Sequence, residues 1–141
     1  MEEAGPRPYA LKAGEGWTYR YGVDFTVKAG ELARGRRLAF VEYTTRVGES
    51  RDRTPTPTED EIFYVLRGPL TFQCGDEAFN VEDGGFVFLP RGIEHGYAIR
   101  GDSEVHLLVV TSPADDDAVG GWGGFVADFE ANGELRANPQ P

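Results

Sequence analysis

Residues 48–68 read GESRDRTPTPTEDEIFYVLRG, and residues 84–99 read GGFVFLPRGIEHGYAI. In the first stretch, a polar segment with two prolines passes into a run of aromatic and branched residues, and Glu61 lies at the junction. In the second, a glycine pair and a Pro-Arg-Gly turn enclose a short apolar run and lead to His95. Both stretches therefore combine strand-forming residues with tight turns, and each places one ionisable residue at the start of a strand.

The sequence on both sides continues this pattern of short strands. Aromatic and β-branched residues accumulate over 17–27 and again over 38–45. Further strand-like runs, separated by Gly, Pro and Asp turns, lie at 61–68, 70–74, 77–81, 84–90, 94–99 and 104–113. Turn signals at intervals of about 8–12 residues are typical of a sandwich or barrel, so the sequence predicts an all-β domain.

Helical spacing occurs only near the C-terminus. The apolar residues of 122–129 lie at positions i, i+3, i+4 and i+7, which predicts one short helix. Its apolar side either packs against the domain or closes the mouth of a barrel. We expect the domain to cover 16–132, with a flexible arm over 1–15 and a frayed tail over 133–141.

The composition fits one acidic domain. The chain has 141 residues, 40% of them hydrophobic, and a formal net charge of −10, which disfavours nucleic-acid and membrane-surface partners. Cys74 is the only cysteine, so no intramolecular disulfide is possible and no zinc cluster is expected. The N-terminus lacks the pattern of a signal peptide, and no apolar run approaches the roughly 20 residues that span a bilayer. We therefore expect a cytoplasmic protein.

The two quoted stretches resemble the two sequence motifs of the cupin superfamily, in particular small single-domain cupins of the quercetin-dioxygenase-like type. The first motif reads Gly, five residues, His-x-His, three or four residues, Glu, six residues, Gly. Gly48, Glu61 and Gly68 keep every spacing, but Thr54 and Thr56 stand in place of the two histidines. The resemblance implies a double-stranded β-helix, or jelly-roll, barrel with the short C-terminal helix added.

The second motif reads Gly, five residues, Pro-x-Gly, two residues, His, three residues, Asn. Its residues are matched at Gly84, Pro90, Gly92 and His95, and only the final asparagine is replaced, by Ile99. The resemblance covers about residues 36–113. In the family, the two histidines of the first motif, its glutamate and the histidine of the second bind one divalent metal inside the barrel.

Only Glu61 and His95 map onto that ligand set. A threonine hydroxyl is a much weaker ligand for first-row ions than imidazole, and catalytic zinc sites ordinarily use three protein ligands. We therefore expect no tightly bound metal or other cofactor, and at most weak binding of a divalent ion through Glu61 and His95. The exception is a site completed by His106 or by a nearby carboxylate such as Asp60.

Glu61 and His95 are the catalytic candidates. Glu61 shares the strand parity of Phe63 and Val65, which points it inward, and a buried carboxylate needs a partner. His95 is the natural partner. The two form either a general acid/base pair or a plain structural hydrogen bond.

The candidate ligand-binding residues are Thr54, Thr56, Phe63, Val65, Phe88, Tyr97, Ile99 and His106. The two threonines either border the cavity or belong to an ordinary loop, and the sequence does not fix the direction of His106. Three functions fit such a cavity. They are a metal-independent isomerase, cyclase, dehydratase or decarboxylase acting on an apolar or aromatic metabolite, a non-catalytic ligand-binding or sensor module, and a metal-dependent dioxygenase or isomerase.

The assembly is predicted from two features. The resemblance to small cupins implies a homodimer, and the aromatic segment 17–25 suits the exchange of N-terminal strands between protomers. In addition, residues 63–66 are apolar at consecutive positions, which indicates a strand buried on both faces. One face lines the barrel, and the other packs on a second layer or on a partner subunit.

Overall fold

The structure is a computed structural model that describes residues 8–29, 39–48, 53–54, 59–112 and 130–139. Its strands are β1 (Trp17–Tyr21), β2 (Val23–Ala29), β3 (Ala39–Thr45), β4 (Arg53–Thr54), β5 (Asp60–Arg67), β6 (Leu70–Cys74), β7 (Glu77–Val81), β8 (Phe86–Leu89), β9 (His95–Ile99), β10 (Val105–Ser112) and β11 (Glu134–Ala137). The described residues contain helical geometry only at 130–132, and the helix expected over 122–129 lies outside them. No helix of this described part is long and apolar enough to cross a membrane.

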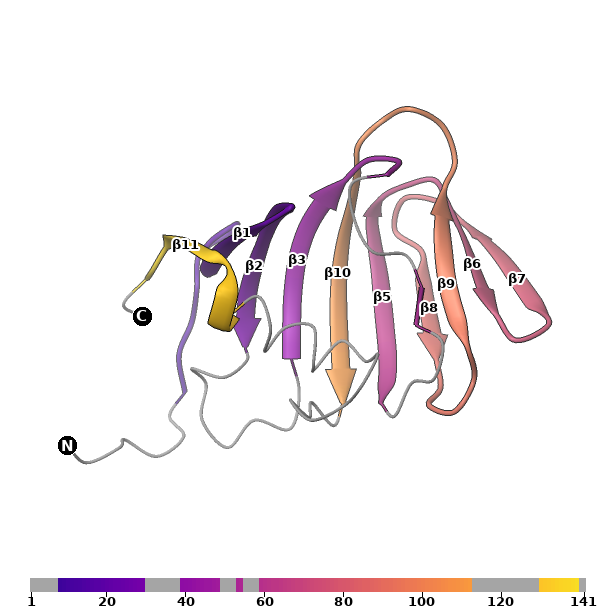
Figure 1. Ribbon diagram of the computed structural model, residues 1–141, viewed down its shortest axis with the longest axis horizontal. Coiled ribbons are helices and arrows are strands. Elements are labelled where there is room, and N and C mark those ends of the chain that lie inside the picture. Colours follow the sequence, from indigo (N-terminus) through magenta and orange to yellow (C-terminus); the bar gives the residue numbers. More distant parts are fainter. Residues whose placement is uncertain (1–7, 30–38, 49–52, 55–58, 113–129, 140–141) are drawn as a thin grey trace.

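The strands form two antiparallel sheets (Figure 1). The larger sheet has the order β11-β1-β2-β3-β10-β5-β8, and the smaller has the order β4-β9-β6-β7. β10 lies between β3 and β5, so a late strand completes the sheet that the early strands begin. This alternation of strands between two sheets is the jelly-roll arrangement, and the all-β prediction is confirmed.

The core lies between the two sheets. Alternate residues are buried along β3 and β10, as expected for strands with one face inside. The ring of Phe63 from the larger sheet lies 5.1 Å from that of Phe72 and 5.9 Å from that of Tyr97, both from the smaller sheet. Burial of each such aromatic side chain contributes about 1.5–3 kcal/mol, so these contacts hold the sheets together.

Motif glycines build the turns that precede the site. Gly84 has a φ of 81° and Gly92 a φ of 85°, a region in which a side chain would be strained. The turn at Gly84 begins the approach to β8, and the turn at Gly92 leads into β9, whose first residue is His95. The second motif is therefore a strand and two turns that place His95 at the start of β9.

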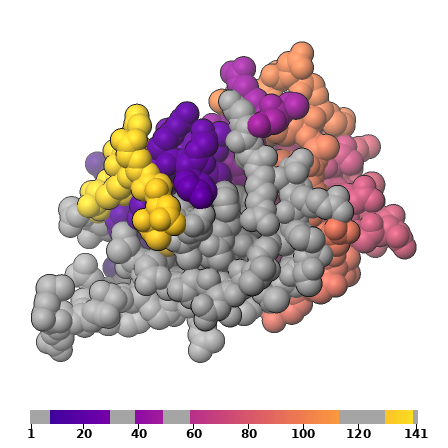
Figure 2. Space-filling model, viewed as in Figure 1, coloured from indigo at the N-terminus to yellow at the C-terminus, as the bar shows by residue number. Residues whose placement is uncertain are grey.

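The C-terminal segment differs from the frayed tail that we expected over 133–141. It contains β11, which pairs with β1 through Thr18 opposite Ala137 and Tyr19 opposite Leu135. Figure 2 shows this segment, in yellow, against the indigo N-terminal strands. All four side chains of β11 are exposed, so no hydrophobic pattern marks the strand. Its backbone instead satisfies hydrogen-bonding groups at the edge of β1.

The described part of the N-terminal arm contacts the sheet. The ring of Tyr9 meets that of Trp17 edge to face at 5.8 Å between centroids, and Leu11 packs against the core. The arm therefore covers the start of β1.

Candidate functional site

Glu61 lies fully buried on β5, the strand between β10 and the edge strand β8 of the larger sheet. On β5 it stands opposite Thr111 of β10 and Leu89 of β8. It shares the inner face of β5 with Phe63 and Val65, which are also buried. The prediction that Glu61 points inward is confirmed.

His95 reaches Glu61 from the opposite sheet. It is the first residue of β9 and stands opposite Cys74 of β6 and Thr54 of β4. Its Nε2 lies 3.1 Å from Oε1 of Glu61, and both side chains are almost completely buried. The two motif residues therefore make a direct contact across the interior.

Each partner of this pair keeps one buried polar atom without a hydrogen bond. Within the described part of the chain, Oε2 of Glu61 and Nδ1 of His95 have no partner. A buried polar atom left in this way costs about 1–3 kcal/mol, and such atoms are rare in native proteins. Each such atom calls for an explanation, such as local strain, a bound water molecule or a catalytic role.

A second polar pair lies in the same interior. The hydroxyls of Tyr43 and Tyr97 are 2.9 Å apart and buried. Burial raises the pKa of Tyr43 well above its usual range, and Tyr97 and the charge of Glu61 raise it further. The phenol of Tyr43 therefore stays neutral, and it lies near enough to Glu61 to sense its charge.

Sequence reasoning missed Tyr43 and a second buried carboxylate, that of Glu59. Tyr43 shares its parity with the buried Ala39 and Val41, so alternation along that strand was a usable signal. Glu59, in the bend just before β5, is also fully buried. Its charge lies near enough to Arg91 to contribute to the raised pKa of that guanidinium, after the larger contribution of Asp60.

The other predicted site residues divide between the core and the surface. Phe63, Val65 and Tyr97 are buried in the core, and Ile99 packs against it. Thr56 lies outside the described residues, and for Thr54 the structure describes the backbone alone.

The expectation that Phe88 lines the interior is wrong. Phe88 is 50% exposed and stands opposite Ile62, on the outer face of the sheet. Val87 and Leu89 are the buried residues of β8. Since the run over 84–90 is apolar at consecutive positions, the sequence alone did not separate its two faces.

Neither His106 nor Asp60 completes the interior site. Nε2 of His106 bonds Oε2 of Glu42, and the other oxygen of Glu42 lies 3.2 Å from Nζ of Lys28. These half-buried residues lie on the face of β10 and β3 opposite to the inner residues, as the alternating burial shows. Asp60 forms an exposed ion pair with Arg91 at 3.1 Å, which lowers the pKa of the Asp60 carboxyl.

Comparison with known proteins assigns the fold to a family. Residues 41–111, half of the chain, match the cupin domain. The chain belongs to the cupins. An uncharacterized protein of Streptomyces coelicolor is 26% identical over 85 residues, which cover 60% of this cupin and 79% of the relative.

Two solved structures have the same fold as this cupin. A predicted oxalate decarboxylase from Thermotoga maritima superposes with a TM-score of 0.64 at 18% identity, over 74% of this chain and 99% of that one. KdgF from Halomonas superposes with a TM-score of 0.60 at 18% identity, over 78% of this chain and 98% of that one. At this identity the likeness concerns the fold alone.

The described interior of this cupin does not fit the four-ligand metal site of its family. Glu61 and His95 supply one carboxylate and one imidazole, and threonines occupy the positions of the other two histidines. No group of three or more His, Cys, Asp or Glu side chains among the described residues is placed to hold a metal ion. Two protein ligands bind first-row ions weakly.

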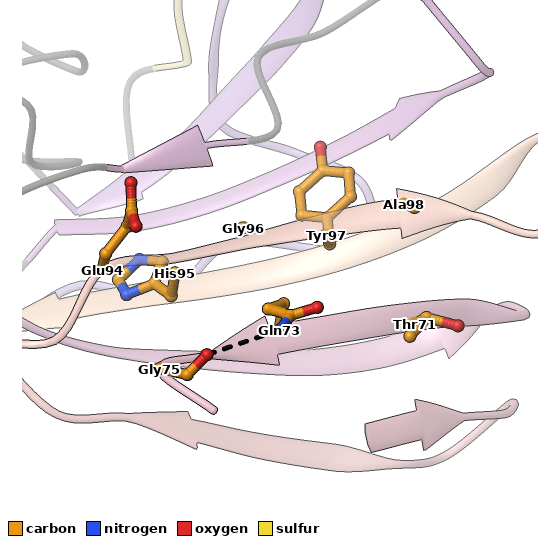
Figure 3. A pocket seen from close by; sticks show the side chains of 8 residues that line it. All are labelled: Thr71, Gln73, Gly75, Glu94, His95, Gly96, Tyr97 and Ala98. Carbon is orange, nitrogen blue, oxygen red and sulfur yellow. Dashed lines mark hydrogen bonds between the residues drawn. The ribbon is translucent and has the colours of Figure 1, made fainter. Parts of the chain in front are cut away.

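A hollow of about 320 Å³ lies on the outer side of the smaller sheet of this cupin (Figure 3). Thr71 and Gln73 line it, and they alternate along β6 with the buried Phe72 and Cys74. Figure 3 shows the Tyr97 side chain projecting away from Thr71 and Gln73. His95 and Tyr97 also line the hollow, so it borders the part of β9 that carries the histidine of the Glu61–His95 pair.

Proposed function

We propose that this cupin is a small-molecule enzyme of the isomerase, cyclase or lyase type, in which Glu61 and His95 transfer protons without a tightly held metal. The observation that carries the proposal is their buried 3.1 Å contact, which leaves Oε2 of Glu61 and Nδ1 of His95 without partners among the described residues. A pair placed only for stability would be expected to satisfy these atoms.

The contact defines the role of each group. With Glu61 ionised, the hydrogen on Nε2 of His95 is donated to Oε1, so Nδ1 carries the free lone pair. Nδ1 accepts a proton from the substrate, and the carboxylate stabilises the imidazolium that forms. The electron pair of the broken bond stays on the substrate. The proton returns to another substrate atom in an isomerisation or to the leaving group in an elimination.

Neighbouring side chains suit an apolar or aromatic substrate. The rings of Phe63, Phe72 and Tyr97 contact one another beside the pair, and the neutral Tyr43 hydroxyl is a hydrogen-bond donor near Glu61. A hydrogen-bond donor in a dry interior stabilises negative charge that develops on a substrate oxygen. The proposal therefore favours a substrate with an oxygen next to the reacting carbon.

Proton transfer is tested with a panel of aromatic and aliphatic carbonyl compounds and hydroxy acids that carry an acidic C–H. The protein is incubated with each compound in D₂O, and turnover and deuterium incorporation are followed by NMR and mass spectrometry. We expect His95→Gln to lower the rate for the active compound about 10²- to 10⁴-fold.

The chain offers a matched control, because its second histidine also contacts a glutamate. His106→Gln removes the contact with Glu42 on the outer face and should leave the rate within about twofold, as expected for a group outside the site. An unchanged rate in His95→Gln would contradict the proposal. A compound that binds but neither reacts nor exchanges would support a non-catalytic binding cupin instead.

A further inference from the structure

The buried carboxylate of Glu61 has no lysine or arginine beside it among the described side chains. It has no exposed surface, and its Oε2 accepts no hydrogen bond from any described residue. The other buried polar side chains of the described chain are those of Thr45, Glu59, His95 and Thr111. Apart from the imidazole, the ionisable groups buried here are therefore acidic.

The cations of the described chain lie outside this interior. Lys28 is half-buried on the outer face, where its Nζ lies 3.2 Å from Glu42. Arg91, which also lies near Glu59, forms an exposed ion pair with Asp60. The other lysine and arginine side chains that the structure describes are exposed. Because solvent and salt screen exposed charges, these cations offset little of the charge of Glu61.

The charge of Glu61 acts on the polar groups around it. Burial raises the pKa of Tyr43 well above its usual range, Tyr97 raises it further, and the charge of Glu61 adds to the shift. The hydroxyls of Tyr43 and Tyr97 lie 2.9 Å apart. Thr111 stands directly opposite Glu61 on the neighbouring strand and is also buried. A ligand next to this carboxylate therefore meets uncharged hydroxyls in a negative electrostatic potential.

We propose that the Glu61–His95 site binds uncharged carbonyl compounds and excludes carboxylates and phosphates, an inference that rests on the proton-transfer function proposed above. A hydroxyl can donate a hydrogen bond to a carbonyl oxygen without any ionic partner. Carboxylates and phosphates are instead held by arginine or lysine, and a buried ion without such a partner is costly. The described interior offers the hydroxyls and lacks the cations.

Repulsion between two carboxylates sets the size of the exclusion. At about 5 Å and an effective dielectric constant of about 20, a ligand carboxylate and Glu61 repel one another strongly enough to weaken binding at least about 100-fold. Proton transfer increases the difference. When Nδ1 of His95 takes a proton from an uncharged ketone, the electron pair of the C–H bond moves onto the ketone oxygen, so one imidazolium and one oxyanion form. A carboxylate substrate would add a further negative charge to the same interior.

The first test compares phenylpyruvate and acetoacetate with their methyl esters, which keep the carbon skeleton and remove the charge. Binding to the wild type is measured at about 150 mM NaCl, where exposed charges are screened. The chain has 2 histidines, so ¹⁵N-histidine labelling gives one NMR reporter inside the barrel, His95, and one outside, His106. We expect the esters to shift only the His95 signals and to bind at least about 100-fold more tightly than the acids. An acid that binds as tightly as its ester, or the absence of ester binding at His95, would overturn the proposal.

The second test removes the inner charge and keeps the shape of the side chain. Glu61→Gln should narrow the difference in affinity between acid and ester to less than about 10-fold. Glu42→Gln is the matched control, because it removes the same charge beside the other histidine, on the outer face, and should leave the difference unchanged. A difference that persists in Glu61→Gln, or that closes equally in both variants, would contradict the assignment to Glu61. If Glu61→Gln does not fold, the comparison on the wild type decides.

The exclusion of anions and the proton-transfer function can be told apart, because binding is measured without turnover. An ester that binds at His95 but exchanges no C–H proton in D₂O would contradict proton transfer and leave the exclusion of anions intact. Exchange on an acid as fast as on its ester would overturn the exclusion and keep the proposed function.

Discussion

At the scale of single residues, this cupin places the same chemical pair in two environments. Glu61 and His95 are buried, and each keeps one atom without a partner among the described residues, whereas His106 and Glu42 are half-buried and Glu42 also pairs with Lys28. A partly exposed ion pair contributes little, but the loss of one member of a buried pair leaves an uncompensated polar group. The inner pair therefore costs the folded state stability. A catalytic function would explain why the chain keeps it.

This cost can be measured in a double-mutant cycle. His95→Leu alone leaves the Glu61 carboxylate buried without a partner and should lower the free energy of unfolding by about 3–5 kcal/mol. Glu61→Met together with His95→Leu removes both polar groups and should lie within about 1 kcal/mol of the wild type. Urea denaturation of the four proteins checks this. A double variant less stable than either single variant would show that the pair stabilises the fold.

The raised pKa of Tyr43 predicts that the protein loses stability in alkaline solution. Burial raises the pKa of Tyr43 in the folded protein above the usual 10.0, so the folded state holds its proton more tightly than the unfolded state does. The contribution of the Tyr43 proton to the free energy of unfolding is fully present below pH 10. It is lost as the pH rises toward the pKa of Tyr43 in the folded protein. We expect Tyr43→Phe to flatten the fall in unfolding free energy between pH 9 and 11. Tyr64→Phe, which changes an exposed tyrosine, should keep the wild-type fall.

At the scale of strands, the sequence predicted the strands and turns that can be recognised from the residue pattern of a single segment. Alternation and turn residues located β1 to β3 and β5 to β10, and the motif spacings brought Glu61 and His95 together. The orientation of Phe88 was wrong because only pairing with β5 distinguishes the two faces of an all-apolar run. β11 was missed because its side chains are exposed and its stability comes from backbone pairing with β1.

Strand β11 yields a prediction of its own. Truncation after Asn132 removes β11 and leaves the backbone of β1 as a free edge. The amide protons of Thr18 and Arg20 should then exchange with solvent faster, while those of β10 in the middle of the sheet keep their rates. We expect global stability to fall by only about 1–2 kcal/mol, since a few backbone hydrogen bonds and no buried side chain are lost. Unchanged exchange in β1 would show that β11 does not protect it.

At the scale of the whole molecule, the net charge and the exposed apolar surface have opposite effects on the association of two chains. Each chain has a formal charge of −10, so two copies repel one another, while exposed apolar side chains such as Phe86 and Phe88 favour their association. Added salt screens the repulsion and leaves apolar contacts intact. The homodimer that the resemblance implies should therefore bind several-fold more tightly at 150 mM than at 10 mM NaCl. A dissociation constant that rises with salt would indicate an interface held by ion pairs.

The central claim is that Glu61 and His95 carry out proton transfer without a tightly held metal. The most direct measurement is the rate of turnover or deuterium exchange on the active compound before and after dialysis against a mild chelator, with the metal content followed by elemental analysis. We expect an unchanged rate at well under one equivalent of bound metal. A rate that is lost on dialysis and restored by iron, manganese, nickel or zinc would contradict the claim and show a metal enzyme.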